Sequence, residues 1–320
     1  MMWRPDRSFR GPDRPTLRDI EPLNRVFADA FTDRYGRDGL VGVRVPHLNT
    51  LVWRYALEDA GAGAMIWRDA DGQMVAFNMV HQSGHEGWMG PLAVRPDRQG
   101  EGLGSTMVRL GLDWLKAQGA RTIGLETMPR TVENIGFYSR IGLVPGPLTV
   151  TLVHDVPRRA MSAPELLSAA GYDLHQRLEA CRRLTDKLSP GVDFTRELTL
   201  TRDLGIGDTT LVREGGELLA FALWHSTPLA AGRGKDEVRI LKLVARSLGA
   251  FRRLLEALHG TAAGEKVGRI AIRCQTDYAE PYLHLIEAGY RVHWTDLRMI
   301  LRGFPQAAVR EGIVLSNWEI

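Results

Sequence analysis

The spacing of apolar residues changes several times along the first half of the chain. Apolar positions between residues 23 and 30 recur at helical spacing, whereas the runs from Ala64 onward have the density and the turn residues typical of strands. The pattern predicts a strand at 16–18, helices at 19–31 and 47–59, strands at 64–67, 74–80 and 88–94, a helix at 106–118, a strand at 122–126, a helix at 132–140 and a strand at 148–153. Strands and helices in this order predict an α/β fold with a mixed sheet.

The second half of the chain repeats this order. It predicts helices within 163–188, strands at 209–212, 218–225 and 238–245, a helix at 250–259, a strand at 269–274, a helix at 280–287 and a strand at 297–301. One strand of each half also shares a sequence pattern, AFNMVHQS at 76–83 and AFALWHST at 220–227. We therefore expect a duplicated domain in which each copy holds its own core. The expected boundaries are an arm at 1–14, a first domain at 15–156 and a second domain at 157–320.

Composition limits the class of protein. The chain has 320 residues, of which 44% are hydrophobic and 25% are charged, as in ordinary globular proteins. Its net charge of +3 is too small and too scattered to predict a nucleic-acid partner, and no apolar run approaches the ~20 residues of a membrane span. Cys181 and Cys274 lie far apart, which predicts neither a disulfide framework nor a bound metal. The charged arm lacks the apolar core of a signal peptide, so we expect a soluble cytoplasmic protein.

The segment LAVRPDRQGEGLGS, residues 92–105, carries the strongest chemical signal. A strand is predicted to end there, a glycine-rich loop follows, and a helix begins with its first amides unpaired. Such amides and the positive end of the helix dipole bind anions, and glycine lets a phosphate approach the backbone. A glycine-rich turn can also be purely structural. A nucleotide P-loop would end in Gly-Lys-Ser/Thr, and a dinucleotide fold would place the loop after the first strand, so neither alternative fits.

Two motifs then resemble those of a known family. Residues 99–104, QGEGLG, match the Gln/Arg-x-x-Gly-x-Gly/Ala signature of the GCN5-related N-acetyltransferases (GNAT), and FYSRIGL at 137–143 is similar to the second motif of that family. The resemblance covers residues 15–153 by motif and residues 195–301 by architecture alone. It implies an α/β protein with two tandem acyl-CoA N-acyltransferase (GNAT) folds, and an acyltransferase that uses acetyl-CoA.

The resemblance also implies which residues hold acetyl-CoA. The pyrophosphate would lie on the amides of residues 99–104, and the pantetheine arm would pair with the backbone of Leu92 and Val94. The strand at 122–126 would diverge from the preceding strand to admit this arm. Thr131 stands where the family often has Asn, and Asn134 replaces a small apolar residue, so this helix departs from the family pattern. The implied cofactor contacts are Leu92, Ala93, Val94, Gln99, Gly100, Glu101, Gly102, Leu103, Gly104, Ser105, Asn134 and Tyr138.

Attack of an amine on a thioester needs three devices. The amine must lose a proton, the oxyanion needs a donor such as the backbone N–H of Ala93 or Val94, and the departing thiolate is best protonated. Tyr138 matches the family position whose phenol protonates the thiolate, although an aromatic residue on the apolar face of a helix can also belong to the core. We therefore expect Tyr138 to be the general acid.

The general base is less well defined by the sequence. Glu86 precedes the strand that leads to the signature, and Glu126 ends the next strand, close to where an amine would enter. We place Glu86 slightly ahead of Glu126, His81 and His85; His81 has a counterpart at His225, which favours a structural role. A base acting through water fits as well as any one of these side chains.

The second copy lacks these devices. Its loop, RSLGAF at 246–251, has no G-x-G-x-G pattern, and Leu285 stands opposite Tyr138 when Gly289 is aligned with Gly142. Side chains in that loop would occupy the space of a pyrophosphate. We expect the second half to be a degenerate scaffold, which could cover the acceptor site of the first.

The observations and the resemblance together predict an enzyme that transfers acetyl directly from acetyl-CoA to a primary amine, without a metal. The acceptor is expected to be a small molecule, with a protein as the less favoured alternative. Two other interpretations stay open. One is a catalytically silent protein that binds or senses CoA, and the other is an acetyltransferase similar to mycothiol synthase, which also pairs two such domains. The sequence defines neither the acceptor nor the oligomeric state.

Overall fold

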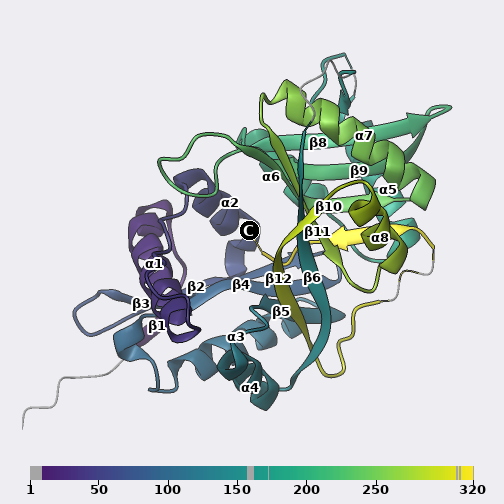
Figure 1. Cartoon of the computed structure of the whole chain (residues 1–320). Coiled ribbons are helices and arrows are strands. Elements are labelled where there is room, and N and C mark those ends of the chain that lie inside the picture. The colour runs from purple at the N-terminus through teal and green to yellow at the C-terminus, as the bar shows by residue number, and fades with distance from the viewer. Residues whose placement is uncertain (1–8, 157–161, 172, 308, 310, 320) are drawn as a thin grey trace, which may run out of the picture.

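The computed structural model describes residues 9–156, 162–171, 173–307, 309 and 311–319 (Figure 1). Within this part of the chain, thirteen strands form one mixed sheet in the order β1-β2-β3-β4-β5-β12-β6-β11-β10-β9-β8-β7, with β13 paired to β10. The mixed α/β fold predicted from the sequence is therefore confirmed. Among the described residues, no helix has the length and apolar character needed to cross a bilayer.

The elements of the first half follow the predicted order. They are β1 (Arg10–Asp13), α1 (Ile20–Arg37), α2 (Thr50–Ala60), β2 (Ala64–Arg68), β3 (Met74–Ser83), β4 (Glu86–Val94), α3 (Leu103–Ala117), β5 (Thr122–Thr127), α4 (Val132–Ile141) and β6 (Leu143–Asp155). Short 3-10 turns occupy Leu17–Asp19, Gly61–Gly63 and Pro96–Arg98.

The second half contains the repeat. Its elements are β7 (Glu165–Leu166), α5 (Leu174–Leu188), α6 (Thr195–Asp203), β8 (Gly207–Glu214), β9 (Glu217–His225), β10 (Glu237–Ala245), α7 (Leu248–Gly264), β11 (Arg269–Gln275), α8 (Ala279–Glu287), β12 (Arg291–Leu301) and β13 (Ile313–Ser316). Helices cover both faces of the sheet (Figure 1).

Strand β3 shows why the sheet is covered on both faces. Side chains alternate along a strand, so Phe77 and Met79 pack with α1 and α2, whereas Ala76 and Val80 pack on the side of α3. The buried Asn78 points to the α3 side, where its amide donates to the backbone oxygen of Met107 at 3.2 Å. A strand buried on both faces reads as a continuous apolar run, as this one does.

The two halves exchange their last long strands. Strand β12 of the second half lies between β5 and β6, with Leu297 opposite Thr127 and Leu148, and β6 of the first half pairs with β11 along its length. Val150 and Leu152 of β6 therefore lie in the core of the second half, and Met299 of β12 lies in a core of the first. One core of each half thus takes residues from a strand of the other, whereas two further cores of the first half consist of its own residues alone.

Two local predictions are wrong for identifiable reasons, and two elements were missed. Residues 16–18 do not form a strand, because Thr16 and Asp19 form a capping box that starts a 3-10 turn. The helical region expected at 163–188 begins with the short strand β7, and helix formation starts only after the cap of Asp173, whose carboxylate accepts from the amide of His175. Helix α6 and strand β13 were not predicted from the apolar pattern.

Candidate active site

Strands β4 and β5 separate where the resemblance implies. Their parallel pairing ends at Met89 and Leu125, whereas β4 stays paired with β3 as far as Val94. The partners of Asn78 and Val80 on β4 are Leu92 and Met89. Two residues, Gly90 and Pro91, lie between these partners, against one residue on β3, so β4 bulges by one residue. A bulge bends the strand and increases its local twist. The edge of β4 beyond Met89 is thus left without a partner strand on the β5 side.

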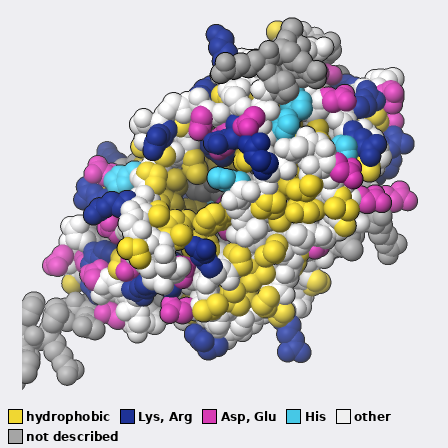
Figure 2. All heavy atoms as spheres, viewed as in Figure 1, with side chains coloured by type: hydrophobic (Ala, Val, Ile, Leu, Met, Phe, Trp, Pro, Cys, Tyr) yellow, Lys and Arg dark blue, Asp and Glu magenta, His cyan; other side chains and the backbone are white. Residues whose placement is uncertain are grey.

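A cavity of about 790 Å³ opens at this separation. Helix α1 and the loop before α2 form one wall, the β4–α3 loop and α4 form another, and residues from β12 and the chain end form the floor. Figure 2 shows the molecular face hollowed here, with hydrophobic side chains around much of the rim. This size is within the range of ligand-binding pockets.

The glycine-rich loop presents open amides to the cavity. Gly100 and Gly102 have φ of +81° and +86°, a conformation in which a side chain would be strained. Gly102 is the N-cap of α3 and has no side chain to accept from the first helical amides, and the amide of Thr106 donates to its oxygen at 3.2 Å. The amides between these residues are therefore oriented for an anion.

Arg98 adds a cation to this loop. Its side chain lines the cavity and pairs with Glu101 at 3.4 Å through Nε, while its buried Nη2 has no hydrogen-bond partner among the described residues. An unsatisfied buried donor is costly, and a phosphate oxygen would satisfy it. Open amides, this donor and the free edge of β4 together fit the diphosphate and the amide-bearing arm of CoA.

Most of the predicted cofactor residues line this cavity. The lining includes Leu92, Ala93, Val94, Gln99, Gly100, Gly102, Gly104, Ser105, Asn134 and Tyr138. Glu101 and Leu103 are not part of the lining, because Glu101 pairs with Arg98 and the Leu103 side chain is buried in the core beneath α3. Any role of these two in binding is limited to their backbone.

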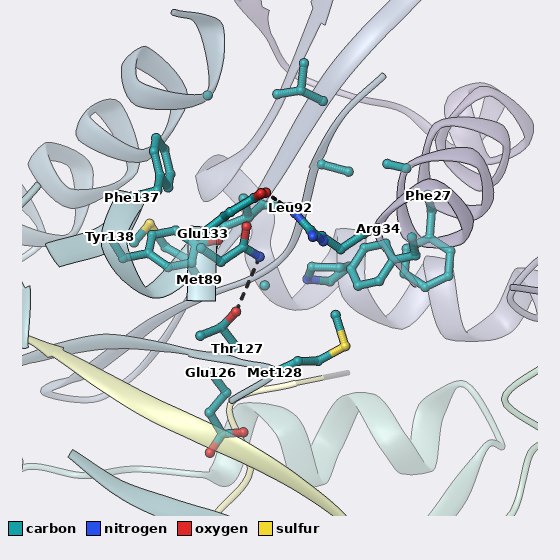
Figure 3. Close-up of a pocket in the computed structure, with 18 of the residues that line it drawn as sticks. Phe27, Arg34, Met89, Leu92, Glu126, Thr127, Met128, Glu133, Phe137 and Tyr138 are labelled. Atoms are coloured by element: carbon teal, nitrogen blue, oxygen red, sulfur yellow. Dashed lines mark hydrogen bonds and ion pairs between the residues drawn. The ribbon is translucent and has the colours of Figure 1, made fainter. Parts of the chain in front are cut away.

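Tyr138 lies on α4 and faces the same cavity as the glycine-rich loop (Figure 3). The helix ends at Gly142, whose φ of +104° closes it in the left-handed conformation. Tyr138 is buried against Phe137, and burial raises the pKa of its phenol above the ordinary value. A phenol held in its protonated form can donate a proton to a thiolate, as expected for a general acid. Asn134, one turn before it, donates to Thr127 at 3.5 Å.

Glu86 does not reach the cavity. It is buried at the start of β4, where its carboxylate accepts hydrogen bonds from the Ser316 hydroxyl at 2.7 Å and from the Trp318 indole. It is absent from the cavity lining in the described structure. The geometry therefore corrects the preference for Glu86 as the base: it anchors the segment after β13. His81 and His85 also lie outside this lining, and His81 is held between Asp59 and Trp88.

Glu126 reaches the end of the cavity, but its oxygens are occupied. It accepts from Arg298 at 2.8 Å, from Arg273 at 2.7 Å and from Thr149 at 2.5 Å. Burial would raise the pKa of Glu126, but the charges of Arg273 and Arg298 outweigh burial and hold it below the ordinary value. A carboxylate held ionised by two guanidinium groups is a weak proton acceptor, which disfavours Glu126 as the base.

Sequence reasoning missed the residues at the acceptor end of the cavity. Asp296 comes from β12, Trp318 and Glu319 follow β13, and Arg34 comes from α1. The alternation of Trp294, Asp296 and Arg298 along β12 was a usable signal, since it places large polar groups on one face of a strand. No pattern near Glu319 indicated its position.

A salt bridge joins two walls of the cavity. Arg34 of α1 contacts Glu133 of α4 at 2.5 Å and Asp38 at 2.7 Å (Figure 3). Asp38 in turn accepts from the hydroxyl of Thr131 at 2.5 Å. Burial would lower the pKa of Arg34, but these carboxylates outweigh it and raise the value. The end of α1 is thus fixed over the start of α4.

The corresponding site of the second half is closed. Ser247 caps α7 by accepting from the amide of Ala250 at 3.2 Å, and strand β13 pairs with β10 over residues 242–245. Leu285 is fully buried at the position that matches Tyr138. Strand β13 thus fills the groove of the second half that would correspond to the open groove of the first.

Comparison with known proteins defines the class. Residues 26–143 match the family model described as "Acetyltransferase (GNAT) family". The match lies within the first half of the chain, and the fold of the whole chain is that of tandem GNAT proteins.

Particular relatives are similar over different lengths. The chain is 33% identical over 76 residues to the mycothiol acetyltransferase of Clavibacter michiganensis subsp. michiganensis, and 32% identical over 79 residues to that of Clavibacter sepedonicus. These matches cover 24% and 25% of this chain and 25% and 26% of the relatives, so they span about a quarter of the length of the curated proteins.

Solved structures match nearly the whole chain. A putative acetyltransferase from Pyrococcus horikoshii has a TM-score of 0.69 at 18% identity, covering 99% of this chain and 97% of its own. A tandem GNAT protein from the clavulanic acid biosynthesis pathway has a TM-score of 0.59 at 11% identity, covering 94% and 99%. Saccharomyces cerevisiae N-myristoyltransferase with bound myristoyl-CoA has a TM-score of 0.63 at 10% identity, covering 95% and 87%. At these identities the likeness shows the fold alone.

Proposed function

We propose that the protein is an N-acetyltransferase that moves the acetyl group of acetyl-CoA to a primary amine of a small molecule. The proposal rests on one observation: the open amides after Gly102, the unpaired edge of β4 and the phenol of Tyr138 face a single cavity. Acetyl-CoA supplies the activated thioester. The free and buried Cys181 and Cys274 are compatible with the cytoplasmic location that we propose.

The residues of the first half divide the remaining tasks. The amides of the β4–α3 loop and the guanidinium of Arg98 hold the diphosphate, and the edge of β4 aligns the arm so that the thioester lies near the bulge at Gly90. A backbone N–H of β4 close to the bulge would stabilise negative charge on the carbonyl oxygen, since Ala93 and Val94 lie three and four residues further along the strand. Tyr138 protonates the leaving sulfur. The apolar walls exclude water, which limits hydrolysis of the thioester.

A second candidate acceptor is the amine of a cysteinyl thiol conjugate. It is favoured by the local similarity to two mycothiol acetyltransferases. A third possibility, a protein that binds CoA without turnover, is favoured by no feature of the cavity, since the phenol of Tyr138 would have no task in it.

Tyr138→Phe tests the proposal. Isothermal titration with acetyl-CoA and release of free CoA with a panel of primary amines, a cysteinyl amine among them, measure binding and turnover. We expect Tyr138→Phe to reduce kcat about 100-fold, the usual contribution of a general acid, with the Kd of acetyl-CoA within about twofold because no contact to the diphosphate is lost. Tyr282→Phe on α8 is the matched control and should match wild type. Binding without CoA release by any amine would support the sensor instead.

A further inference from the structure

We propose that the second half of the chain supplies the catalytic base of the first, and that Glu319 accepts the proton of the acceptor ammonium. This inference rests on the proposed function and names a residue for the step that the first half leaves unassigned. It also defines the acceptor as an amine that arrives as a cation.

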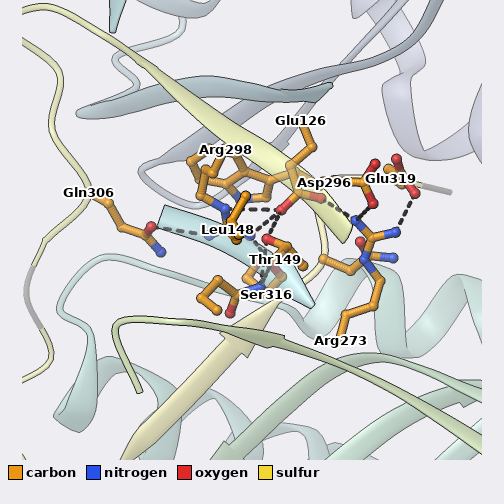
Figure 4. Close-up of polar contacts among 12 residues, drawn as sticks. Glu126, Leu148, Thr149, Arg273, Asp296, Arg298, Gln306, Ser316 and Glu319 are labelled. Carbon is orange, nitrogen blue, oxygen red and sulfur yellow. Dashed lines mark hydrogen bonds and ion pairs between the residues drawn. The ribbon is translucent and has the colours of Figure 1, made fainter. Parts of the chain in front are cut away.

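The floor of the cavity holds an unequal set of charges (Figure 4). Arg273 is shared by three carboxylates, with contacts of 2.7 Å to Glu126, 2.9 Å to Asp296 and 2.5 Å to Glu319. Arg298 pairs with Glu126 from the other side at 2.8 Å. Three carboxylates against two guanidinium groups leave one negative charge without a counterion when all are ionised. An ammonium group in the cavity would neutralise it.

Accessibility separates the three carboxylates. The side chain of Glu126 is 0% exposed and that of Asp296 is 2% exposed, and both oxygens of Asp296 are occupied by Arg273 and the indole of Trp294. The side chain of Glu319 is 43% exposed and lines the cavity. Glu319 is therefore the carboxylate that an incoming amine can touch, while Arg273 and Asp296 position it.

The preceding residues fix Glu319 in place. The amide of Asn317 donates to the backbone oxygen of Leu241 at 2.9 Å, and the fully buried Trp318 lies under the guanidinium of Arg298 at 3.8 Å. The indole of Trp318 also donates to Glu86. These anchors bring the backbone of Trp318 beside Gly90, where β4 leaves β5: a Cβ added at Gly90 would lie 3.5 Å from the Trp318 oxygen. The residue after Trp318 thus lies at the point where the thioester is expected.

The charged surroundings suit a proton acceptor. Burial raises the pKa of Asp296 to about 8, helped by Glu319 and Glu126 and opposed by Arg273. The partial burial of Glu319 raises the pKa of its carboxyl as well, with Arg273 opposing the rise and Glu126 adding to it. The phenol of Tyr35, on α1, faces the same carboxylates and has a raised pKa, chiefly from burial. A carboxylate whose pKa is raised takes a proton from an ammonium more readily than an ordinary carboxylate does.

The proposed reaction balances in protons and electron pairs. The ammonium gives one proton to Glu319, and the nitrogen lone pair then forms a bond to the carbonyl carbon. The carbon–sulfur bond breaks with its electron pair on sulfur, which takes a proton from Tyr138. Tyr138 regains a proton as the nitrogen loses its second one, and Glu319 releases its proton to solvent. The products are the amide, free thiol and one proton.

Glu319→Gln tests this role, with Glu256→Gln on the exposed face of α7 as the matched control and Glu319→Asp as the conservative variant. The assay is CoA release with the best amine of the panel across pH, beside titration with acetyl-CoA. We expect kcat to fall about 100-fold in Glu319→Gln, with the Kd of acetyl-CoA unchanged and partial recovery in Glu319→Asp. In wild type, kcat/KM should rise with pH through the apparent pKa of the Asp296–Glu319 pair, and this limb should be lost in Glu319→Gln.

Hydroxylamine, which is already neutral at pH 7, supplies a second readout. It should be acetylated by Glu319→Gln at a rate within a few-fold of wild type, because it needs no base before attack. An unchanged kcat and pH profile in Glu319→Gln would overturn the role of Glu319. Failure of wild type to bind acetyl-CoA would instead overturn the proposed function, which keeps the two outcomes apart.

Discussion

The N-termini of α3 and α7 occupy equivalent places in the two halves. They differ in whether a side chain accepts a hydrogen bond from the first amides of the helix. At α3 the cap is Gly102, which offers no side chain, and the adjoining edge of β4 has no partner strand on one side. At α7 the hydroxyl of Ser247 accepts from the helix, and β13 pairs with the matching edge of β10. The same fold can therefore keep a groove open for a ligand or close it with its own chain.

The comparison also explains what the closed half does. Strand β13 takes the place along β10 that an extended ligand arm would take along β4. The chain that leaves β13 then runs to the cavity of the first half and carries Trp318 and Glu319 there. The half whose own groove is closed thus lines the cavity of the other, in line with the expectation that it could cover the acceptor site.

Gly102→Val should have the largest effect, because it alters the open groove of the first half. The φ of +86° at Gly102 is strained for valine, so the loop would shift and its amides would no longer converge. Loss of two or three such hydrogen bonds, about 3 kcal/mol in total, corresponds to a rise of about 100-fold in the Kd of acetyl-CoA by titration. Gly249→Val, in the equivalent helix of the second half, should leave the Kd within about twofold. An equal effect of both variants would contradict the assignment of the open groove.

Ser247→Ala should have a moderate effect, on stability alone. Removing the hydroxyl that accepts from Ala250 costs about 1 kcal/mol, which would lower the melting temperature by about 2 °C for a chain of this size. Acetyl-CoA stoichiometry should stay at one per chain by titration, since β13 still fills the groove. Ser247→Asp retains an acceptor at the cap and should keep the wild-type melting temperature. A second CoA site in Ser247→Ala would show that the cap, and not β13, closes the groove.

Glu133→Gln should have the smallest effect. Its side chain is 69% exposed, and such ion pairs contribute between about 0 and 1 kcal/mol. Because the pair with Arg34 fixes α1 over α4, we expect a change in the KM of the amine of less than about fivefold. The wild-type KM should approach that of the variant as salt rises, because salt screens exposed pairs. A large effect on kcat instead would place Glu133 in the chemistry.

The part of the site that could be predicted lies in a local motif. Gly100 and Gly102 lie in one loop and Tyr138 on one helix, and the resemblance to the two GNAT motifs predicted that they share a site; all three line the same cavity. Most of the strands and helices follow from apolar period for the same reason. The predicted element boundaries were wrong where a capping side chain sets the start of a helix, as at Thr16 and Asp173.

The part that could not be predicted depends on which strands become neighbours. β6 and β12 both alternate apolar and polar residues, and nothing within either strand says which half it joins. The acceptor end follows from that exchange, since Asp296 reaches the cavity only because β12 lies beside β5. Glu319 depends on the path of the chain beyond β13. Glu86 was predicted as the base because it is a carboxylate close to the glycine-rich signature. Its hydrogen-bond partners, Ser316 and Trp318, are distant in sequence, so the pattern around Glu86 did not indicate them.

The exchanged strands have a consequence for the order of events on the ribosome. β5 is synthesised long before its neighbour β12. The edge of β5 therefore stays unpaired until more than half of the chain has been made. An unpaired edge is a template for wrong pairing, which makes this interval the stage at which a chaperone or a neighbouring nascent chain would matter most.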